Sequence, residues 1–394
     1  MIGLKRAVQR KGPFYLYLGA MISLLACIFY FGWSRTWSAL FILRPSPPFL
    51  DMRLIQGAVI SATQGLNPHM FNPNDPWGRA LDHPLIWVKI GEALNLPDEP
   101  RFIQFCILVI LCFVGISAYI LYRFPSFGLL ACLLSTATLL GMERGNTDLI
   151  IYSLVFVSAL MFPKTPSLIP ILVATALKLY PVFSLVIFLI KKRFLPLLLS
   201  LIATLAIFAY MWDELAIIRS ASLDTGDSYL TYGFMSLAAY FSLQGLGLAI
   251  VLCLAIFVVV LYLEKMKGLQ RPGLEDEFES NLFIAGASIY VGTFIVSSNW
   301  DYRLMFLIFC VPFLGARPFP LSGFLVALII VAMNDLVIHD LLGTTGRAII
   351  SFAKISVFVV LSAYLSLRLL AIFRRPVMRP SNSTQAALDT RRPH

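Results

Sequence analysis

The chain has 394 residues, of which 59% are hydrophobic and only 13% are charged. Soluble globular proteins carry roughly 25% charged residues, so this composition excludes a soluble enzyme and predicts a protein that crosses a membrane many times. The net charge of +10 would suggest a nucleic-acid partner in a soluble protein. Here the basic residues flank apolar runs, where they orient spans, and we therefore expect no binding of nucleic acid.

Apolar runs follow one another along the whole chain, near residues 14–33, 102–122, 127–142, 148–162, 167–190, 194–212, 246–263, 281–298, 303–316, 320–337 and 348–370. Each crossing needs roughly 20 residues, so we predict an all-α, polytopic transmembrane helix bundle with about ten full spans plus a short hairpin of half-helices. Residues 1–373 would form this membrane domain. The basic, proline-bearing residues 374–394 are expected to be a disordered cytoplasmic tail.

Lysine and arginine concentrate in alternate connections, which include Arg123, Lys164 and residues 191–193. This bias places those connections in the cytoplasm, together with both termini. The basic N-terminus resembles a signal peptide, but the apolar run that follows is too long, so we expect residues 14–33 to be a retained first span. The protein would then lie in the cell (inner or plasma) membrane, with a polar site on its extracytoplasmic face.

The first extracytoplasmic loop, residues 49–101, begins with a helical pattern. Met52, Ile55, Val59 and Ala62 recur at helical spacing, which predicts a short helix lying in the membrane interface. Asp51 would stand at its N-terminus, where the helix dipole favours a carboxylate. A simple helix-capping role for Asp51 is an equally good interpretation of the local sequence.

A second polar cluster, made of Glu143, Arg144, Asn146 and Asp148, occupies a very short turn between two apolar runs. Charged residues this dense at the ends of spans usually face a bundle interior or a cavity. Ordinary capping, with Glu143 paired to Arg144, is the alternative interpretation.

The run 167–190 contains Lys178, Tyr180 and Pro181 at its middle. Proline removes a backbone donor and lysine is costly in lipid, so we favour two short helices with Lys178 at a wet apex. A single kinked span whose lysine reaches toward the interface is the alternative.

The last two polar groups are Asp301-Tyr302-Arg303 and His339-Asp340. Arg303 and Lys178 suit a phosphate, arginine through its two-pronged fork and lysine as a point charge. Tyr302 could stack on a sugar or belong to the interfacial aromatic belt. His339 could act as an acid or base, although a solvated loop histidine is the commoner case.

Nucleotide-binding glycine motifs and a zinc-protease motif are missing from the sequence. A nucleotide-activated substrate on the extracytoplasmic face is therefore not expected. A lipid-linked substrate fits better, because its polyprenyl tail can lie in the bilayer.

At this point the chain resembles a known group, the GT-C membrane glycosyltransferases, and within it glycosyltransferase family 87, which uses polyprenol-phosphate-mannose donors. The resemblance runs in order over about residues 14 to 370. It rests on Asp51, Gly65-Leu66-Asn67-Pro68, Glu143-Arg144-Gly145-Asn146-x-Asp148, Ala176-Leu177-Lys178-x-Tyr180-Pro181 and Asp301-Tyr302-Arg303. His69 stands where relatives often have tyrosine, so contacts to the acceptor could differ there.

The resemblance implies an inverting hexosyltransferase, with mannose favoured, that moves the sugar from a polyprenyl-phosphate donor to an extracytoplasmic lipid or glycan acceptor. Asp51 would be the catalytic base, and Lys178, Arg303 and Arg144 would bind the donor phosphate. The remaining substrate-binding residues would be Arg53, Glu143, Asn146, Asp148, Tyr180, Asp301, Tyr302 and His339. No cofactor is expected, and we predict no metal site because the first loop lacks an adjacent acidic pair, although dependence on a divalent metal stays open.

Two other functions compete with this hypothesis. A flippase or transporter of a lipid-linked sugar also needs a wet cavity and cations for phosphate, but its site normally lies near the membrane midplane. A structural membrane subunit would use the polar clusters as packing contacts.

Overall fold

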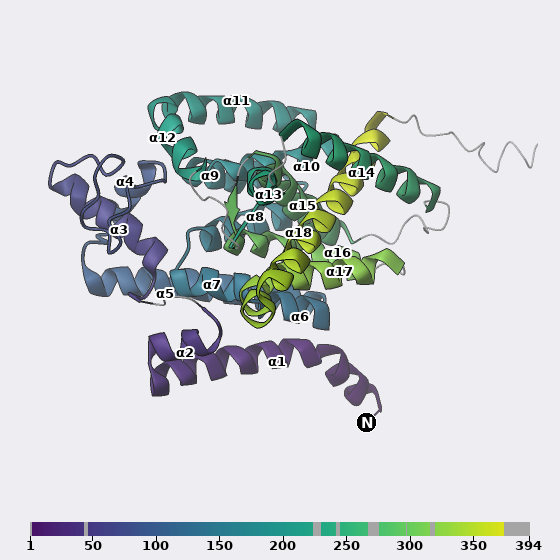
Figure 1. The fold of residues 1–394 in the computed structure, drawn as a ribbon, viewed down its shortest axis with the longest axis horizontal. Coiled ribbons are helices and arrows are strands. Elements are labelled where there is room, and N and C mark those ends of the chain that lie inside the picture. Colours follow the sequence, from purple (N-terminus) through teal and green to yellow (C-terminus); the bar gives the residue numbers. More distant parts are fainter. Residues whose placement is uncertain are drawn as a thin grey trace, which may run out of the picture.

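The computed structural model describes residues 2–42, 46–223, 230–241, 245–266, 276–296, 298–315 and 320–373. These residues are almost entirely helical, as the composition predicted, and Figure 1 shows the helices packed into one bundle. The predicted disordered tail, residues 374–394, lies outside the described residues.

Six helices in the described part of the chain are long and apolar enough to cross a membrane: Lys11–Phe31, Glu99–Arg123, Phe127–Arg144, Gly247–Lys265, Glu277–Val296 and Asp335–Phe373. Phe194–Tyr210 and Trp212–Ile218, bent by 81°, would make a seventh. Four apolar helices are shorter: Asp148–Met161, Thr165–Leu177, Tyr180–Ile190 and Ser322–Met333. A multi-pass membrane architecture is thus confirmed, whereas the count of about ten full spans is not, because several apolar runs form helices shorter than the roughly 20 residues a crossing needs.

The N-terminal third of the chain forms one edge of the bundle and includes the polar loop 49–101. Its helices are α1 (Ile2–Phe31), α2 (Trp33–Ala39), α3 (Leu50–Thr63), α4 (Ile86–Ala93) and α5 (Glu99–Arg123). In Figure 1, α3 and α4 lie together at one side of the bundle, and α1 with α2 runs along its lower edge. Only 6% of the spanning part of α1 is buried, so this helix is exposed on the outside of the bundle.

The helix predicted after the first span is present as α3, with Asp51 in its first turn. The protein covers α3 nearly all round, and even the polar side chains Gln56 and Ser61 are buried. Ser61 donates to Asn72 at 2.8 Å and Gln56 to the carbonyl of Leu96 at 3.1 Å, so the following loop supplies the polar partners.

The middle of the chain forms the helices that carry the polar turns. They are α6 (Phe127–Leu133), α7 (Thr136–Arg144), α8 (Asp148–Met161), η1 (Thr165–Ser167), α9 (Leu168–Leu177), η2 (Tyr180–Leu185), α10 (Val186–Ile190), α11 (Phe194–Tyr210) and α12 (Trp212–Leu223). The helix in the run 167–190 stops at Leu177, and Lys178 has an extended backbone (φ −153°, ψ 131°). This break agrees with the prediction of two short helices, but Lys178 is buried and does not lie at a wet apex.

The C-terminal part fills the centre and closes the bundle. Its elements are β1 (Thr231–Tyr232), α13 (Phe234–Phe241), α14 (Gly245–Met266), α15 (Glu277–Val296), β2 (Asn299–Trp300), η4 (Asp301–Cys310), α16 (Val311–Gly315), α17 (Pro320–Met333) and α18 (Asp335–Phe373). β1 and β2 pair antiparallel, with Thr231 opposite Trp300. Within the spanning window of α15, 83% of the residues are buried, which makes it the central helix. α18 is kinked at Gly343, whose φ of 55° is not helical.

One glycine sets the distance between α3 and the loop that follows it. A Cβ atom added to Gly57 would lie 2.7 Å from the backbone of Asn74 and Asp75. We expect Gly57→Ala to push this loop away and to lower the free energy of unfolding by about 1–3 kcal/mol. Thermal unfolding in detergent measures this, with Gly19→Ala as the control, since a Cβ at Gly19 meets no atom within 4 Å. Equal stability of the two variants would contradict the prediction.

Candidate functional site

Asp51 lies where the start of α3 meets the end of α7. The backbone N–H of Phe49, just before α3, donates to the carbonyl of Glu143 at 3.2 Å. The Asp51 carboxylate accepts a hydrogen bond from Asn146 at 2.6 Å and one from Arg79 at 3.2 Å. The Asp51 side chain is 19% exposed, so a ligand can reach this carboxylate.

The turn between α7 and α8 explains how Asn146 reaches Asp51. Gly145 has a left-handed backbone (φ 58°), and the N–H groups of Gly145 and Asn146 donate to the carbonyls of Met142 and Gly141, which is a Schellman ending. The side-chain oxygen of Asn146 then accepts from the N–H of Asp148 at 2.8 Å. The same amide thus caps α8 with its oxygen and holds Asp51 with its nitrogen.

Asp148, the first residue of α8, is fully buried and contacts two cations. It accepts a hydrogen bond from Lys178 at 2.5 Å, and its other oxygen lies 3.4 Å from Nε of Arg303. We call Asp148, Lys178 and Arg303 the Asp148 cluster. Lys178 comes from the break after α9, and Arg303 comes from the first turn of η4. Taking charges out of water is costly, and this opposite pairing offsets the cost.

Aromatic rings from the predicted motifs cover the cations of the Asp148 cluster. The guanidinium of Arg303 lies 4.8 Å from the centre of the Tyr180 ring, and Lys178 lies 5.9 Å from that of Tyr302. Arg303 also donates to Asn299 at 2.5 Å. Tyr302 therefore lies beside a cation of the Asp148 cluster.

Two predicted substrate residues are held in a group beside Asp51. Glu143 accepts from the indole of Trp33 at 3.3 Å and pairs with Arg144 at 3.2 Å. Arg144 lies 5.0 Å from the ring of Trp77, on which Arg79 also stacks at 5.2 Å. Arg144 is thus near Asp51 rather than in the Asp148 cluster.

Three other predicted residues have partners elsewhere. Arg53 pairs with Glu99 at 2.6 Å. Asp301 pairs with Lys354 of α18 at 2.7 Å, and Asp335 lies 3.9 Å from the same lysine. His339 is half-buried on α18, one turn after Asp335.

Sequence reasoning did not select Arg79 as a site residue. Arg79 donates to both Asp51 and Asp75 and to the carbonyl of Leu50 at 2.7 Å. Burial alone would lower its pKa, but the hydrogen bonds and charges of Asp75 and Asp51 raise the pKa of the Arg79 guanidinium above its ordinary value. Arg79 therefore stays charged and fixes the orientation of Asp51. In the sequence, only its position in the polar loop 49–101, which also contains Asp51, could have indicated this role.

Sequence reasoning also missed His83. Its Nε2 lies 3.1 Å from the hydroxyl of Thr147, and its Nδ1 lies 2.5 Å from Asp82. Thr147 stands between Asn146 and Asp148, so His83 holds the turn that links Asp51 to the Asp148 cluster. An Asp-His dipeptide in a loop is too common to reveal this contact.

Among the residues that the structure describes, no group of three or more His, Cys, Asp and Glu side chains is placed to hold a metal ion. Comparisons of the chain with protein-family models, with curated proteins and with solved structures gave no match. The chemistry of this site therefore follows from its geometry: the partly exposed carboxylate of Asp51 and the cations Lys178, which is buried, and Arg303, which is partly exposed, are joined by one turn.

Proposed function

We propose that this protein is an integral membrane glycosyltransferase. It would transfer a hexose, with mannose favoured, from a polyprenyl-phosphate-sugar donor to a lipid or glycan acceptor on the extracytoplasmic face, with inversion. The observation that carries this proposal is the turn 146–148, whose Asn146 holds the accessible Asp51 and whose Asp148 holds Lys178 and Arg303. A proton acceptor and a phosphate-binding pair are thus held at a fixed separation.

Charge supports the donor phosphate as the ligand of the Asp148 cluster. One carboxylate and two cations leave the cluster with one net positive charge, which matches the single negative charge of a sugar phosphodiester. When the sugar leaves, the lipid phosphate becomes a monoester with more negative charge. Lys178 and Arg303 would stabilise that developing charge in the transition state.

The reaction then needs one base and no acid. Asp51 takes the proton of an acceptor hydroxyl as that oxygen attacks the anomeric carbon of the sugar. The bond from this carbon to the phosphate oxygen breaks on the opposite face, and the oxygen keeps the electron pair. Arg79 and Asn146 hold the Asp51 carboxylate for this attack.

A nearby apolar cavity suits the lipid part of such a donor. It has a volume of about 320 Å³ and lies between α4, α9, α11 and α12. Its lining includes Ile86, Ala176 and Ile207, and Ala176 is only two residues before Lys178. The first isoprenoid units beyond the phosphate could occupy this cavity while the rest of the tail lies in the bilayer.

The test of this function is sugar transfer in proteoliposomes from radiolabelled polyprenyl-phosphate donors that carry mannose, glucose or arabinose in turn. Transfer of mannose or glucose to a lipid or glycan acceptor supports the proposal, whereas transfer of arabinose alone would contradict a hexosyltransferase. Absence of transfer, together with movement of the donor between leaflets, would instead support a flippase.

Arg303 offers a separate test through donor binding. We expect Arg303→Ala to weaken donor binding by about tenfold to a hundredfold, because a hydrogen bond to a charged group contributes about 1.5–3 kcal/mol. The exposed Arg101, which pairs with Asp98 at 3.9 Å, gives the control Arg101→Ala. Titration of the purified variants with labelled donor measures the affinity. An affinity equal to that of the control would remove Arg303 from the phosphate site.

A further inference from the structure

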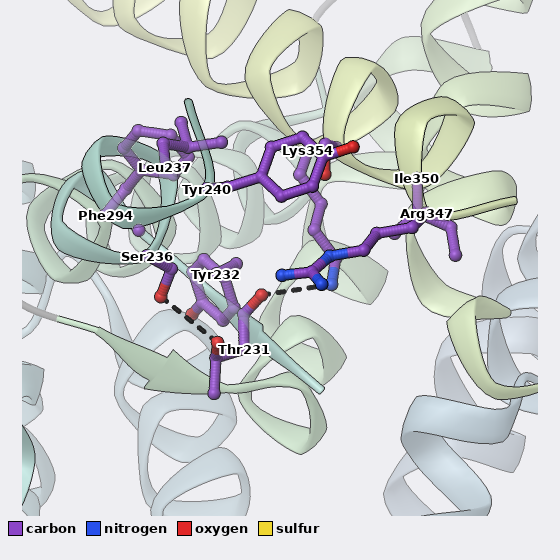
Figure 2. Close-up of a pocket in the computed structure, with 11 residues that line it drawn as sticks. Thr231, Tyr232, Ser236, Leu237, Tyr240, Phe294, Arg347, Ile350 and Lys354 are labelled. Atoms are coloured by element: carbon purple, nitrogen blue, oxygen red, sulfur yellow. Dashed lines mark hydrogen bonds between the residues drawn. The ribbon is translucent and has the colours of Figure 1, made fainter. Parts of the chain in front are cut away.

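Three charged side chains meet in the interior of the bundle, away from Asp51. Lys354 of α18 is buried, and its Nζ lies 2.7 Å from Oδ1 of Asp301 and 3.9 Å from Oδ2 of Asp335. Figure 2 shows Lys354 reaching from α18 toward Thr231 of β1, whose carbonyl lies 3.5 Å from the same Nζ. We call Asp301, Asp335 and Lys354 the Lys354 cluster.

The Lys354 cluster joins the starts of three elements. Asp301 begins η4 and Asp335 begins α18. Oδ1 of Asp335 accepts a hydrogen bond at 3.4 Å from the hydroxyl of Thr136, which begins α7. Arg303 follows two residues after Asp301, and α7 ends at the turn that leads to Asp148. The charge of the Lys354 cluster therefore acts on elements that position the site described above.

The charges in the Lys354 cluster do not balance if both aspartates are ionised. Two carboxylates then face one ammonium group, and among the described residues Lys354 is the cation within ion-pair distance of either carboxylate. Asp301 and Asp335 are each only 1% exposed, so water hardly screens the extra negative charge. A buried group in such surroundings usually becomes neutral, which for a carboxylate means binding a proton.

Hydrogen bonding is incomplete at the same place. Oδ2 of Asp301 and Oδ2 of Asp335 are both buried, and neither accepts a hydrogen bond from the residues that the structure describes. The two carboxyl groups are close enough for a hydrogen bond with each other. Ionised carboxylates only accept, so this bond forms only when one of the two is protonated. Burial first, and the charge of Asp335 second, raise the pKa of the Asp301 carboxyl well above its ordinary value.

The groups around the two carboxyls do not change charge over the same pH range. Besides Lys354, the charged and titratable neighbours are Arg347 of α18, Arg303 of η4, Tyr232 of β1 and Tyr290 of α15. Arginine stays charged, and tyrosine ordinarily titrates near pH 10. Arg303 is directed to Asp148, and Arg347 lies over the ring of Tyr240. α7 contributes the hydroxyl of Thr136, and α17, which packs on both η4 and α18, has no titratable side chain.

We propose that Asp301 and Asp335 together bind one proton between their Oδ2 atoms, which makes the Lys354 cluster a buried proton-binding site. The protonated pair carries one negative charge, which balances the charge of Lys354. The proton also completes a hydrogen bond that ties the start of α18 to the start of η4. This inference does not depend on the sugar transfer proposed above.

The sign of the resulting pH dependence follows from where the proton binds. In the unfolded chain the two carboxyls are separate and lose their protons near the ordinary aspartate pKa of about 3.9. The folded protein keeps one more proton between that value and the raised pKa of Asp301. The stabilisation is therefore fully present at acid pH and is lost as the pH rises.

The experiment measures denaturant unfolding of the purified protein in neutral detergent from about pH 5 to about pH 9, for the wild type and Asp335→Asn. The amide of the asparagine donates to Asp301 permanently, and its oxygen still accepts from Thr136. We expect the ratio of folded to unfolded protein to fall by an additional factor of about ten per pH unit in the wild type, which alone releases the shared proton on unfolding. Asp335→Asn should therefore be more stable than the wild type at the alkaline end.

A plain ion pair between Asp335 and Lys354 predicts the opposite result. Replacing an ionised Asp335 would lower stability throughout this pH range and leave the pH dependence unchanged, and that outcome would overturn the proposal. Asp340→Asn is the matched control, because it changes an exposed carboxylate of the same helix. Its pH dependence should equal that of the wild type.

Infrared spectroscopy detects the proton itself. A protonated carboxyl group has a carbonyl stretch distinct from that of a carboxylate, and this band shifts in heavy water. At neutral pH the wild type should show one such band that is missing from Asp335→Asn and from Asp301→Asn and is kept in Asp340→Asn. If neither Asp335→Asn nor Asp301→Asn removes a protonated-carboxyl band, both aspartates are ionised and the proposal is wrong.

Discussion

Replacing Asp51 with asparagine is expected to lower sugar transfer by about 10²–10⁴-fold, which is the usual contribution of a general base, while the protein stays folded. Asparagine has the same shape as aspartate, and its oxygen still accepts a hydrogen bond from Arg79 or Asn146. Its amide takes up no proton from an acceptor hydroxyl. Donor binding should be unchanged, because the proposed phosphate contacts lie in the Asp148 cluster.

The measurement is the initial rate of transfer in proteoliposomes that contain equal amounts of wild type, Asp51→Asn and the control Asp340→Asn. Asp340 is an exposed carboxylate of α18, so its replacement should leave the rate unchanged. Donor titration and thermal unfolding of the same three proteins show whether folding and binding are intact. Transfer by Asp51→Asn at the rate of the control would exclude Asp51 as the base.

Replacing Asp148 with asparagine is expected to give the largest loss of stability. The change leaves the buried Lys178 and the mostly covered Arg303 without their carboxylate, and breaking a buried ion pair by removing one partner costs about 3–5 kcal/mol. Lys178→Met should cost less, because Arg303 still neutralises Asp148 in that variant. A larger loss of stability in Asp148→Asn than in Lys178→Met would therefore show that one carboxylate neutralises both cations.

Asp276 provides a matched control for this prediction. It pairs with Arg123 at 2.8 Å, but both side chains are partly exposed, at 30% and 57%. Exposed ion pairs contribute about 0–1 kcal/mol to stability. The melting temperature of Asp276→Asn in detergent should therefore be close to that of the wild type. Equal melting temperatures for Asp148→Asn and Asp276→Asn would contradict the burial and pairing of the Asp148 cluster.

The sequence predicted the features that depend on neighbouring residues. Composition predicted a helical membrane protein, and the helical spacing of apolar residues predicted a helix that begins next to Asp51. The polar interruption at Lys178 predicted the break after α9, and the short polar stretch between two apolar runs predicted the tight turn before Asp148. Each of these follows from hydrophobic periodicity or from the backbone preference of one residue, which act over a few positions.

The tertiary structure decided which polar residues meet. Asn146 and Asp51 are 95 residues apart, and no periodicity relates them. Arg79 and His83 lie in an irregular loop, where spacing does not indicate the direction of a side chain. Arg53, two residues from Asp51, turns to Glu99 instead. The number of long spans also depends on packing, since short apolar helices such as α8 can be buried within the bundle without crossing the membrane alone. Local pattern therefore determined the elements, and long-range packing and charge pairing determined the site.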